Sequence, residues 1–156
     1  MRSVVELEIA APQADVAELF ADPRLAPQWM DDVQEVESVN GILGAEGSSY
    51  RLVQKWGRLD FVGTVVRRNL PHELRVTLDS PRVSVTVVGT FRRLSRRKVL
   101  LRSEETFAFK GLRNRLLGIF AQSAIRRVHR RHMRAFKHFA ETSAGMSDQT
   151  AVPFSL

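Results

Sequence analysis

The sequence predicts an α+β domain in which a curved, seven-stranded antiparallel sheet packs against one long C-terminal helix. Three observations lead to this fold class. Residues 3–10 alternate apolar and charged side chains, as a half-buried strand does. Six further strand-like segments, separated by short turns, fill residues 33–109, and short turns join antiparallel neighbours. Residues 112–141 then carry apolar side chains at helical spacing without a proline.

Two short helices are predicted between the first two strands. The first strand ends before Pro12, and proline suits the first turn of a helix because its missing N–H would have no partner there. Apolar residues follow at helical spacing until Asp22 and Pro23 end that helix. A second helical turn, at residues 25–30, carries Trp29.

The later strands are separated by turn-forming residues such as Asn40-Gly41. Gly41, Gly44 and Gly47 lie between two strands and do not open a helix, so we interpret them as a turn and not as a phosphate-binding loop. The predicted ranges of these six strands are 33–40, 48–56, 59–69, 73–79, 83–92 and 97–109.

The long helix is predicted to be strongly amphipathic, with its apolar face on the sheet. Residues spaced at 100° place on that face Leu117, Phe120, Ala121, Ala124, Ile125, Val128, Ala135, Phe136 and Phe139. The opposite side is predicted to be a basic face of Arg126, Arg127, Arg130, Arg134 and Lys137. We predict one ligand-binding domain over residues 1–142 and a flexible C-terminal tail over 143–156, where the composition turns small and polar.

Most of the net charge of +7 is concentrated in that helix. Residues 110–140 contain nine Lys or Arg and no Asp or Glu, which leaves 15 of the 24 basic residues elsewhere against 17 acidic ones. Such asymmetry favours an acidic partner, for example an anionic membrane surface, although a solvated basic face is an open alternative. Nucleic acid is disfavoured, because no base-stacking aromatic residues alternate with these arginines.

Composition and short motifs exclude several classes of function. The absence of cysteine excludes disulfides, thiolate nucleophiles and cysteine-ligated metals. The N-terminus lacks the basic start and apolar run of a signal peptide, so a cytoplasmic protein is expected. His129 and His132 lie three apart without a further ligand at suitable spacing, so we predict no metal site and no cofactor. The oligomeric state stays open, and a homodimer through a sheet edge is one alternative.

The order of elements, together with particular residues near the N-terminus, resembles a known family. The opening strand followed by IAAPQADVAELFADP, the APQW segment ending at Trp29, and DDVQEVESV resemble the START-like (SRPBCC) superfamily, in particular its polyketide cyclase/dehydrase and lipid-transport branch. The resemblance implies a helix-grip fold with a deep apolar cavity between sheet and C-terminal helix, used for lipids, polyketides, hormones or aromatic substrates. The Trp-x-Ser-x-Arg strand motif of aromatase/cyclases is absent, so their chemistry is not carried over.

Strand parity predicts which side chains face this cavity, because alternate residues of a strand point to opposite sides. Glu105 stands out as an ionisable residue in phase with Leu101 and Phe107, and His132 falls within the apolar stripe of the helix. We predict a ligand site lined by Trp29, Tyr50, Gln54, Trp56, Phe61, Phe91, Ser103, Phe107, Phe120 and Val128.

Two interpretations of Glu105 and His132 remain open. A carboxyl and an imidazole in one apolar cavity can act as general acid and base, since burial raises the pKa of the first and lowers that of the second. Alternatively, Glu105 pairs with Arg131 while His132 donates to a backbone carbonyl, and both are satisfied interior groups. The functions expected are therefore binding or transport of a hydrophobic molecule or lipid, a cyclase/dehydrase-like enzyme, or attachment of the basic helix face to a membrane or nucleic acid.

Overall fold

The computed structural model describes residues 1–56 and 60–150 and contains one seven-stranded sheet with its helices on one side. The strands are β1 (Arg2–Ile9), β2 (Val33–Asn40), β3 (Ser49–Gln54), β4 (Phe61–Asn69), β5 (Glu73–Asp79), β6 (Val83–Ser95) and β7 (Lys98–Phe109). The helices are α1 (Gln13–Ala21), the 3-10 turn η1 (Pro23–Leu25), α2 (Ala26–Trp29) and α3 (Gly111–Thr150).

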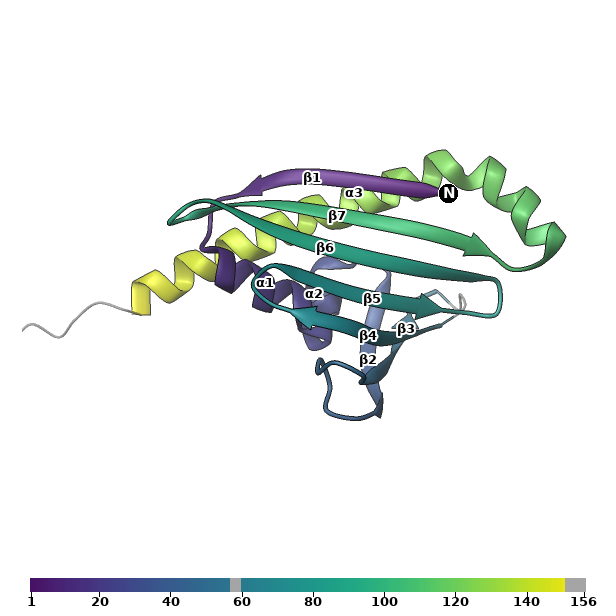
Figure 1. The fold of residues 1–156 in the computed structure, drawn as a ribbon, viewed down its shortest axis with the longest axis horizontal. Helices are drawn as coiled ribbons and strands as arrows, with labels where there is room; N and C mark the ends of the chain where they lie inside the picture. Colours follow the sequence, from purple (N-terminus) through teal and green to yellow (C-terminus); the bar gives the residue numbers. More distant parts are fainter. Residues whose placement is uncertain (57–59, 151–156) are drawn as a thin grey trace, which may run out of the picture.

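The sheet is antiparallel throughout and has the strand order β1-β7-β6-β5-β4-β3-β2. Strands β2 to β7 follow one another as a meander, and β1 then pairs with β7, so β1 and β2 form the two edges (Figure 1). The predicted α+β fold, its seven strands and its two short helices after the first strand are confirmed. The strand predicted at 48–56 is shorter, since Lys55 and Trp56 already form a turn.

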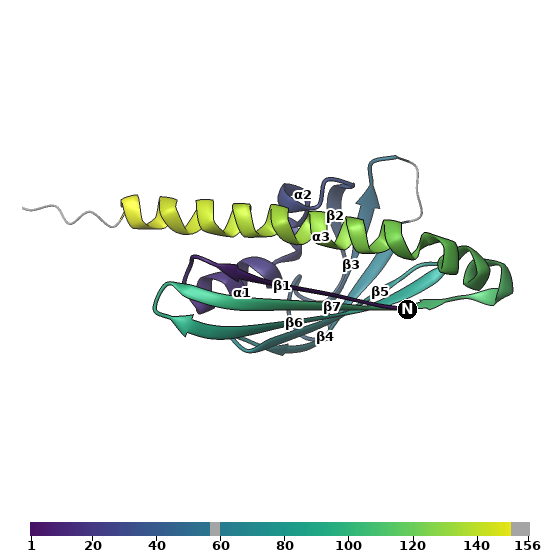
Figure 2. The same cartoon turned by 90° about the horizontal axis from the view of Figure 1, so that it is seen from above.

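The sheet curves around the helices, which all lie on its concave side (Figure 2). Helix α1 contacts β6, β7 and α3, while α2 contacts β2 and α3. Strand parity agrees with the burial of Leu52, Val65, Val85 and Leu101, which all face the concave side. The core therefore lies between the concave face, the short helices and α3.

Close packing inside the sheet depends on Gly63 of β4. A Cβ at this position would lie 2.5 Å from the ring of Tyr50 on the neighbouring strand β3, which is far inside van der Waals contact. The bare backbone of Gly63 therefore gives the Tyr50 ring its place on the concave face. In the β2–β3 connection, Gly41, Gly44 and Gly47 all have positive φ, in agreement with the predicted turn.

The predicted apolar face of helix α3 agrees with the structure in the middle of the helix and is wrong at its first turns. Its buried residues are His129, His132, Met133, Phe136, Ala140 and Ala144. Phe136 is buried and Phe139 packs against the core as predicted, and Ala121, Ile125, Val128 and Ala135 are partly buried. Ala124 is exposed, and Leu117 and Phe120 are 56% and 86% exposed. The first turns of α3 carry apolar side chains on the side that faces away from the sheet. The prediction assigned these side chains to the face that contacts the sheet, and this assignment was wrong at Leu117 and Phe120.

Helix α3 also extends further than expected. It is 40 residues long and continues to Thr150, so residues 143–150 are helical where a flexible tail was predicted. The reason is visible at Ala144, which is buried in the core and gives the last turns a packing partner. The rest of the predicted tail, residues 151–156, lies outside the described residues.

Candidate functional site: an apolar cavity with Glu105 in its wall

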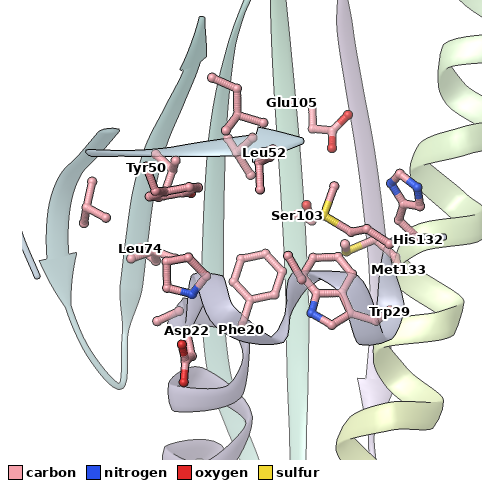
Figure 3. A pocket seen from close by; sticks show the side chains of 18 residues that line it. Phe20, Asp22, Trp29, Tyr50, Leu52, Leu74, Ser103, Glu105, His132 and Met133 are labelled. Carbon is pink, nitrogen blue, oxygen red and sulfur yellow. The ribbon is translucent and has the colours of Figure 1, made fainter. Parts of the chain in front are cut away.

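The candidate site is a cavity between the short helices, the concave sheet and the middle of α3 (Figure 3). Its lining is mostly apolar, and its polar members include Glu105, Ser103 and His132. The other labelled side chains in Figure 3 are Phe20, Asp22, Trp29, Tyr50, Leu52, Leu74 and Met133. The site thus combines an apolar surface with a few polar groups, as small-molecule pockets do.

The cavity is smaller than the resemblance implied. Its volume is about 80 Å³, whereas pockets for drug-sized ligands measure roughly 300–1,000 Å³. The space between α3 and the sheet is filled by aromatic rings, because Phe136 lies 5.2 Å from Phe20 and 5.1 Å from Trp29 between ring centroids. Phe91 packs edge-on against Phe20 at 5.6 Å. A ligand much larger than a few heavy atoms therefore requires these rings to move.

Five of the twelve predicted ligand and catalytic residues line this cavity. Trp29, Tyr50, Ser103, Glu105 and His132 all contribute to its wall. They come from α2, β3, β7 and α3, so the fold brings together positions that are more than a hundred residues apart in the sequence. Burial raises the pKa of the Tyr50 phenol above its usual range, and this group stays neutral.

The remaining predicted ligand residues lie outside the cavity lining. Trp56 is 76% exposed because β3 ends before it, and Phe120 points outward from α3. Phe91 is a buried core residue and Phe61 is packed against the core. Three others are only partly buried and do not reach the cavity, namely Gln54, Phe107 and Val128. Phe107 instead lines a surface groove beside the first turns of α3.

Glu105 is the ionisable group most strongly affected by the cavity. Burial raises the pKa of its carboxyl to about 7, the nearby His132 lowers it and Asp32 raises it. No hydrogen bond to this carboxyl is found within residues 1–56 and 60–150, and the Nε2 atom of His129 lies 3.7 Å from its Oε1. Glu105 is therefore divided between its neutral and ionised forms near neutral pH.

His129 forms a buried polar cluster that the sequence analysis missed. Its Nδ1 lies 2.8 Å from Ser3 Oγ of β1, and its Nε2 lies 3.0 Å from Ser103 Oγ of β7. Burial lowers the pKa of His129 to about 4, so the imidazole is neutral at pH 7. The parity of β1 offered one indication, because Ser3 is in phase with Val5 and Ile9 and lies opposite Glu105 in the β1–β7 register.

His132 contacts the loop before β2, and neither partner proposed for the alternative interpretation is found. Its Nε2 lies 3.1 Å from Asp32 Oδ1, and this imidazole lowers the pKa of the Asp32 carboxyl. Both atoms are buried and make no well-aligned hydrogen bond among the described residues. Arg131 pairs with Asp31 at 3.1 Å and not with Glu105. The pairing of Glu105 with Arg131 was wrong, since Arg131 points away from the sheet.

Asp31, Asp32 and His132 are the residues that could hold a metal ion, because their ligand atoms lie within 4.8 Å of one another. Asp31 is exposed and already carries the guanidinium of Arg131, which neutralises part of the charge that a cation would need. The histidine pair weighed from the sequence does not converge, since both ring nitrogens of His129 face serine hydroxyls. The contacts fit an ion pair between α3 and the β2 loop.

Comparison with known proteins gives a likeness of fold. No family model matches the chain, and no curated protein matches its sequence. Among solved structures, an aromatase/cyclase from a Streptomyces species superposes with a TM-score of 0.72 at 17% identity, over 90% of this chain and 93% of that one. A START superfamily protein from Mycobacterium smegmatis gives 0.68 at 12% identity, over 93% and 97% of the two chains.

A third solved structure, norcoclaurine synthase from Thalictrum flavum in complex with dopamine and hydroxybenzaldehyde, gives a TM-score of 0.65 at 15% identity, over 89% of this chain and 86% of that one. These identities are too low to carry an activity from one chain to another. Within the described part of the chain, no helix is long and apolar enough to cross a bilayer. The seven-stranded antiparallel sheet, the short helices after β1 and the long α3 give this chain the helix-grip fold of the START-like superfamily.

Proposed function

We propose that this protein binds a small hydrophobic molecule whose single polar group meets Glu105. The observation that carries the proposal is a carboxyl group in a mostly apolar wall, whose side chain is only 20% exposed and has no hydrogen-bond partner among the described residues. A buried polar group without a partner costs free energy, and a ligand that supplies one recovers that cost. Binding of this kind is also what the START-like resemblance implies.

A second unsatisfied group supports the same proposal. Trp29 lines the cavity, and its Nε1 is buried without a hydrogen-bond acceptor among the described residues. An indole N–H only donates, so it favours a ligand with an acceptor oxygen. Protonated Glu105 can also donate to such an oxygen. We therefore expect a compact ligand with a carbonyl or hydroxyl group, and larger ligands only where the Phe20 and Trp29 rings move aside.

Filling the cavity tests this proposal. Val87 lines the cavity and lies opposite Glu105 in the β6–β7 register, so Val87→Phe places a ring beside the carboxyl. The matched control is Val88→Phe, on the opposite face of the same strand. We expect Val87→Phe to weaken binding of a compact ketone, cyclohexanone, by about tenfold or more, a loss of at least about 1.4 kcal/mol, while Val88→Phe leaves it unchanged.

The measurement is the change in Trp29 fluorescence when the ketone binds, in a Trp56→Phe background that removes the emission of the exposed indole. Equal binding by both phenylalanine variants would contradict the proposed site. Native mass spectrometry of the freshly purified protein, followed by extraction, then identifies any apolar molecule that it carries.

A second candidate function is acid–base catalysis at the same carboxyl. It is favoured by the pKa of about 7 at Glu105, which matches the requirement that a general base or acid titrate near the working pH. The predicted pair is revised here: His132 is engaged with Asp32, whereas neutral His129 lies 3.7 Å from the Glu105 carboxyl. His129 thus becomes the positioning partner of Glu105.

Hydrogen–deuterium exchange of 2-tetralone in D₂O tests this chemistry without knowledge of the substrate, because a base that removes a proton next to a ketone incorporates deuterium there. We expect Glu105→Gln to abolish any exchange above the buffer rate while cyclohexanone binding changes only a few-fold. Exchange that persists in Glu105→Gln would remove Glu105 from this role.

A further inference from the structure

The first turns of α3 carry a group of large apolar side chains that no part of the described structure covers. We call this group the apolar edge, and it consists of Leu112, Leu116, Leu117, Ile119 and Phe120. Their exposed fractions lie between 52% and 86%. Single exposed apolar residues are common on soluble proteins, but five within nine residues of one helix are a contiguous patch of the kind that marks an interaction surface.

The position of this segment makes the apolar edge accessible. Figures 1 and 2 show the first turns of α3 projecting past the ends of the strands, at one end of the molecule. The segment is held in place by Gly118, where a Cβ would lie 2.6 Å from the ring of Phe109. Because Gly118 and Phe109 fix the inner side, the outer side of these turns faces away from the sheet. The contact between Gly118 and Phe109 therefore holds the apolar edge in an outward position.

The edge continues along α3 as a line of arginines. At 100° per residue, Leu112, Leu116 and Phe120 share one outward line, and Arg127, Arg130 and Arg134 fall within the same arc of about 80°. All three arginines are exposed and none forms an ion pair within residues 1–56 and 60–150. Residues 106–140 contain no Asp or Glu, and the first acidic residue of α3 is Glu141, beyond these arginines, which pairs with Lys137. The outward face of α3 is thus apolar at its first turns and cationic behind them.

We propose that this outward face docks on an anionic membrane, with the apolar edge inserted at the lipid interface and the arginines held at the headgroups. An anionic bilayer offers hydrocarbon and negative charge side by side, which is the pattern that this helix face presents. A second copy of the chain would cover the apolar edge, but its residues 106–140 offer no negative charge to the arginines. Nucleic acid would neutralise the arginines but leave the apolar edge exposed to water. The proposal does not depend on the ligand of the Glu105 cavity.

The first test separates insertion from simple charge attraction. Leu116→Ser combined with Phe120→Ser removes two exposed side chains of the apolar edge, and the control Ile42→Ser removes an equally exposed apolar side chain on the β2–β3 loop. We expect the double variant to bind vesicles of phosphatidylcholine and phosphatidylglycerol at least about tenfold more weakly, and the control to bind as the unmodified chain does.

The second test concerns the arginines. Arg127→Ser, Arg130→Ser and Arg134→Ser together should weaken binding to the same vesicles by about a hundredfold, since each basic residue at an anionic surface contributes roughly a factor of five to ten. The matched control replaces Arg92, Arg93 and Arg96, which are exposed on the β6–β7 hairpin, and loses the same charge. Equal losses in the two triple variants would overturn the proposal in favour of adsorption through net charge.

A fluorescence measurement places the edge relative to the lipid. Phe120→Trp in a Trp56→Phe background introduces a reporter at the apolar edge, while Trp29 in the core serves as an internal reference. On anionic vesicles we expect the new indole to shift to shorter wavelength and to be quenched by brominated lipid. An unquenched reporter on vesicle-bound protein would overturn insertion. A loss of dimer mass in Leu116→Ser/Phe120→Ser, with unchanged vesicle binding, would assign the edge to a second copy instead.

Discussion

Glu105→Gln is expected to make the protein more stable than the unmodified chain above pH 7. Glu105 has a pKa of about 7 in the fold against 4.5 as its ordinary value, so the folded state binds more protons than the unfolded state between these two values. Stability therefore falls as the pH rises from about 4.5 through 7, by about 3 kcal/mol in total. Glutamine cannot ionise and avoids this loss.

The measurement is urea unfolding of both proteins from pH 4.5 to pH 8, and the predicted quantity is the growth of the stability difference across that range. His129 also titrates in this interval, because burial lowers its pKa to about 4, so its contribution to stability rises with pH up to about 6.5 in both proteins. Both proteins contain His129, so the comparison removes its contribution apart from its coupling to the Glu105 carboxyl 3.7 Å away. The other titratable groups facing Glu105 are Asp32 and His132, which are also unchanged.

Glu104→Gln is the matched control on the opposite face of β7. Arg2 and Arg102 hold the pKa of Glu104 at about 2, so this carboxylate contributes stability above pH 4.5 that is lost as the pH falls through 2. Its ion pairs are largely solvated, and the loss in Glu104→Gln should stay below about 1 kcal/mol at pH 7. The two neighbouring substitutions are thus expected to have opposite signs. A Glu105→Gln difference that does not change with pH would show that the carboxyl is not desolvated.

Phe136→Ala is expected to produce the largest loss of stability on α3. Phe136 is fully buried and packs edge-on against the rings of both Phe20 and Trp29. Truncating it removes these contacts and leaves a void beside the cavity, which costs about 3–5 kcal/mol for a buried phenylalanine. That is a large share of the roughly 5–15 kcal/mol that stabilises a domain of this kind.

Phe120→Ala provides the matched comparison on the same helix. Its side chain is 86% exposed, so the expected change in the free energy of unfolding lies within about 0.5 kcal/mol. Urea unfolding at pH 7 measures both variants. Where Phe136→Ala proves too unstable to purify, Phe136→Leu should show a smaller loss in the same direction. Similar losses at positions 120 and 136 would contradict the orientation of α3 described above.

The sequence was a good guide to the sheet because strand parity and turn residues are local. Alternation over β6 and β7 placed Phe91, Leu101, Ser103 and Glu105 on one face, and all four lie on the concave side of the structure. The same reasoning was less successful for α3. The first turns of α3 are apolar on the side that faces away from the sheet, whereas its middle is apolar on the side that faces the sheet. One apolar face drawn through both sets of residues could not match the structure along the whole helix.

The candidate site was predictable residue by residue but not as an arrangement. Glu105 and His132 were recognised as ionisable groups on apolar faces, and both line the cavity. The neighbours of these two residues were not predicted. Ser3, Asp32 and His129 come from distant parts of the chain and come close to the site only when β1, α3 and the loop before β2 pack together.

The sequence by itself therefore determined the α+β class, the order of elements, the antiparallel meander and the concentration of positive charge on the last helix, because hydrophobic periodicity, turn residues and charge counts are properties of neighbouring residues. Only the tertiary structure decided which face of α3 meets the sheet, how little space remains beside Glu105, and that the residues from Leu112 to Phe120 stay exposed. These features depend on packing between segments far apart in the sequence, where the shapes of Phe20, Trp29 and Phe136 and the end of the sheet set the outcome.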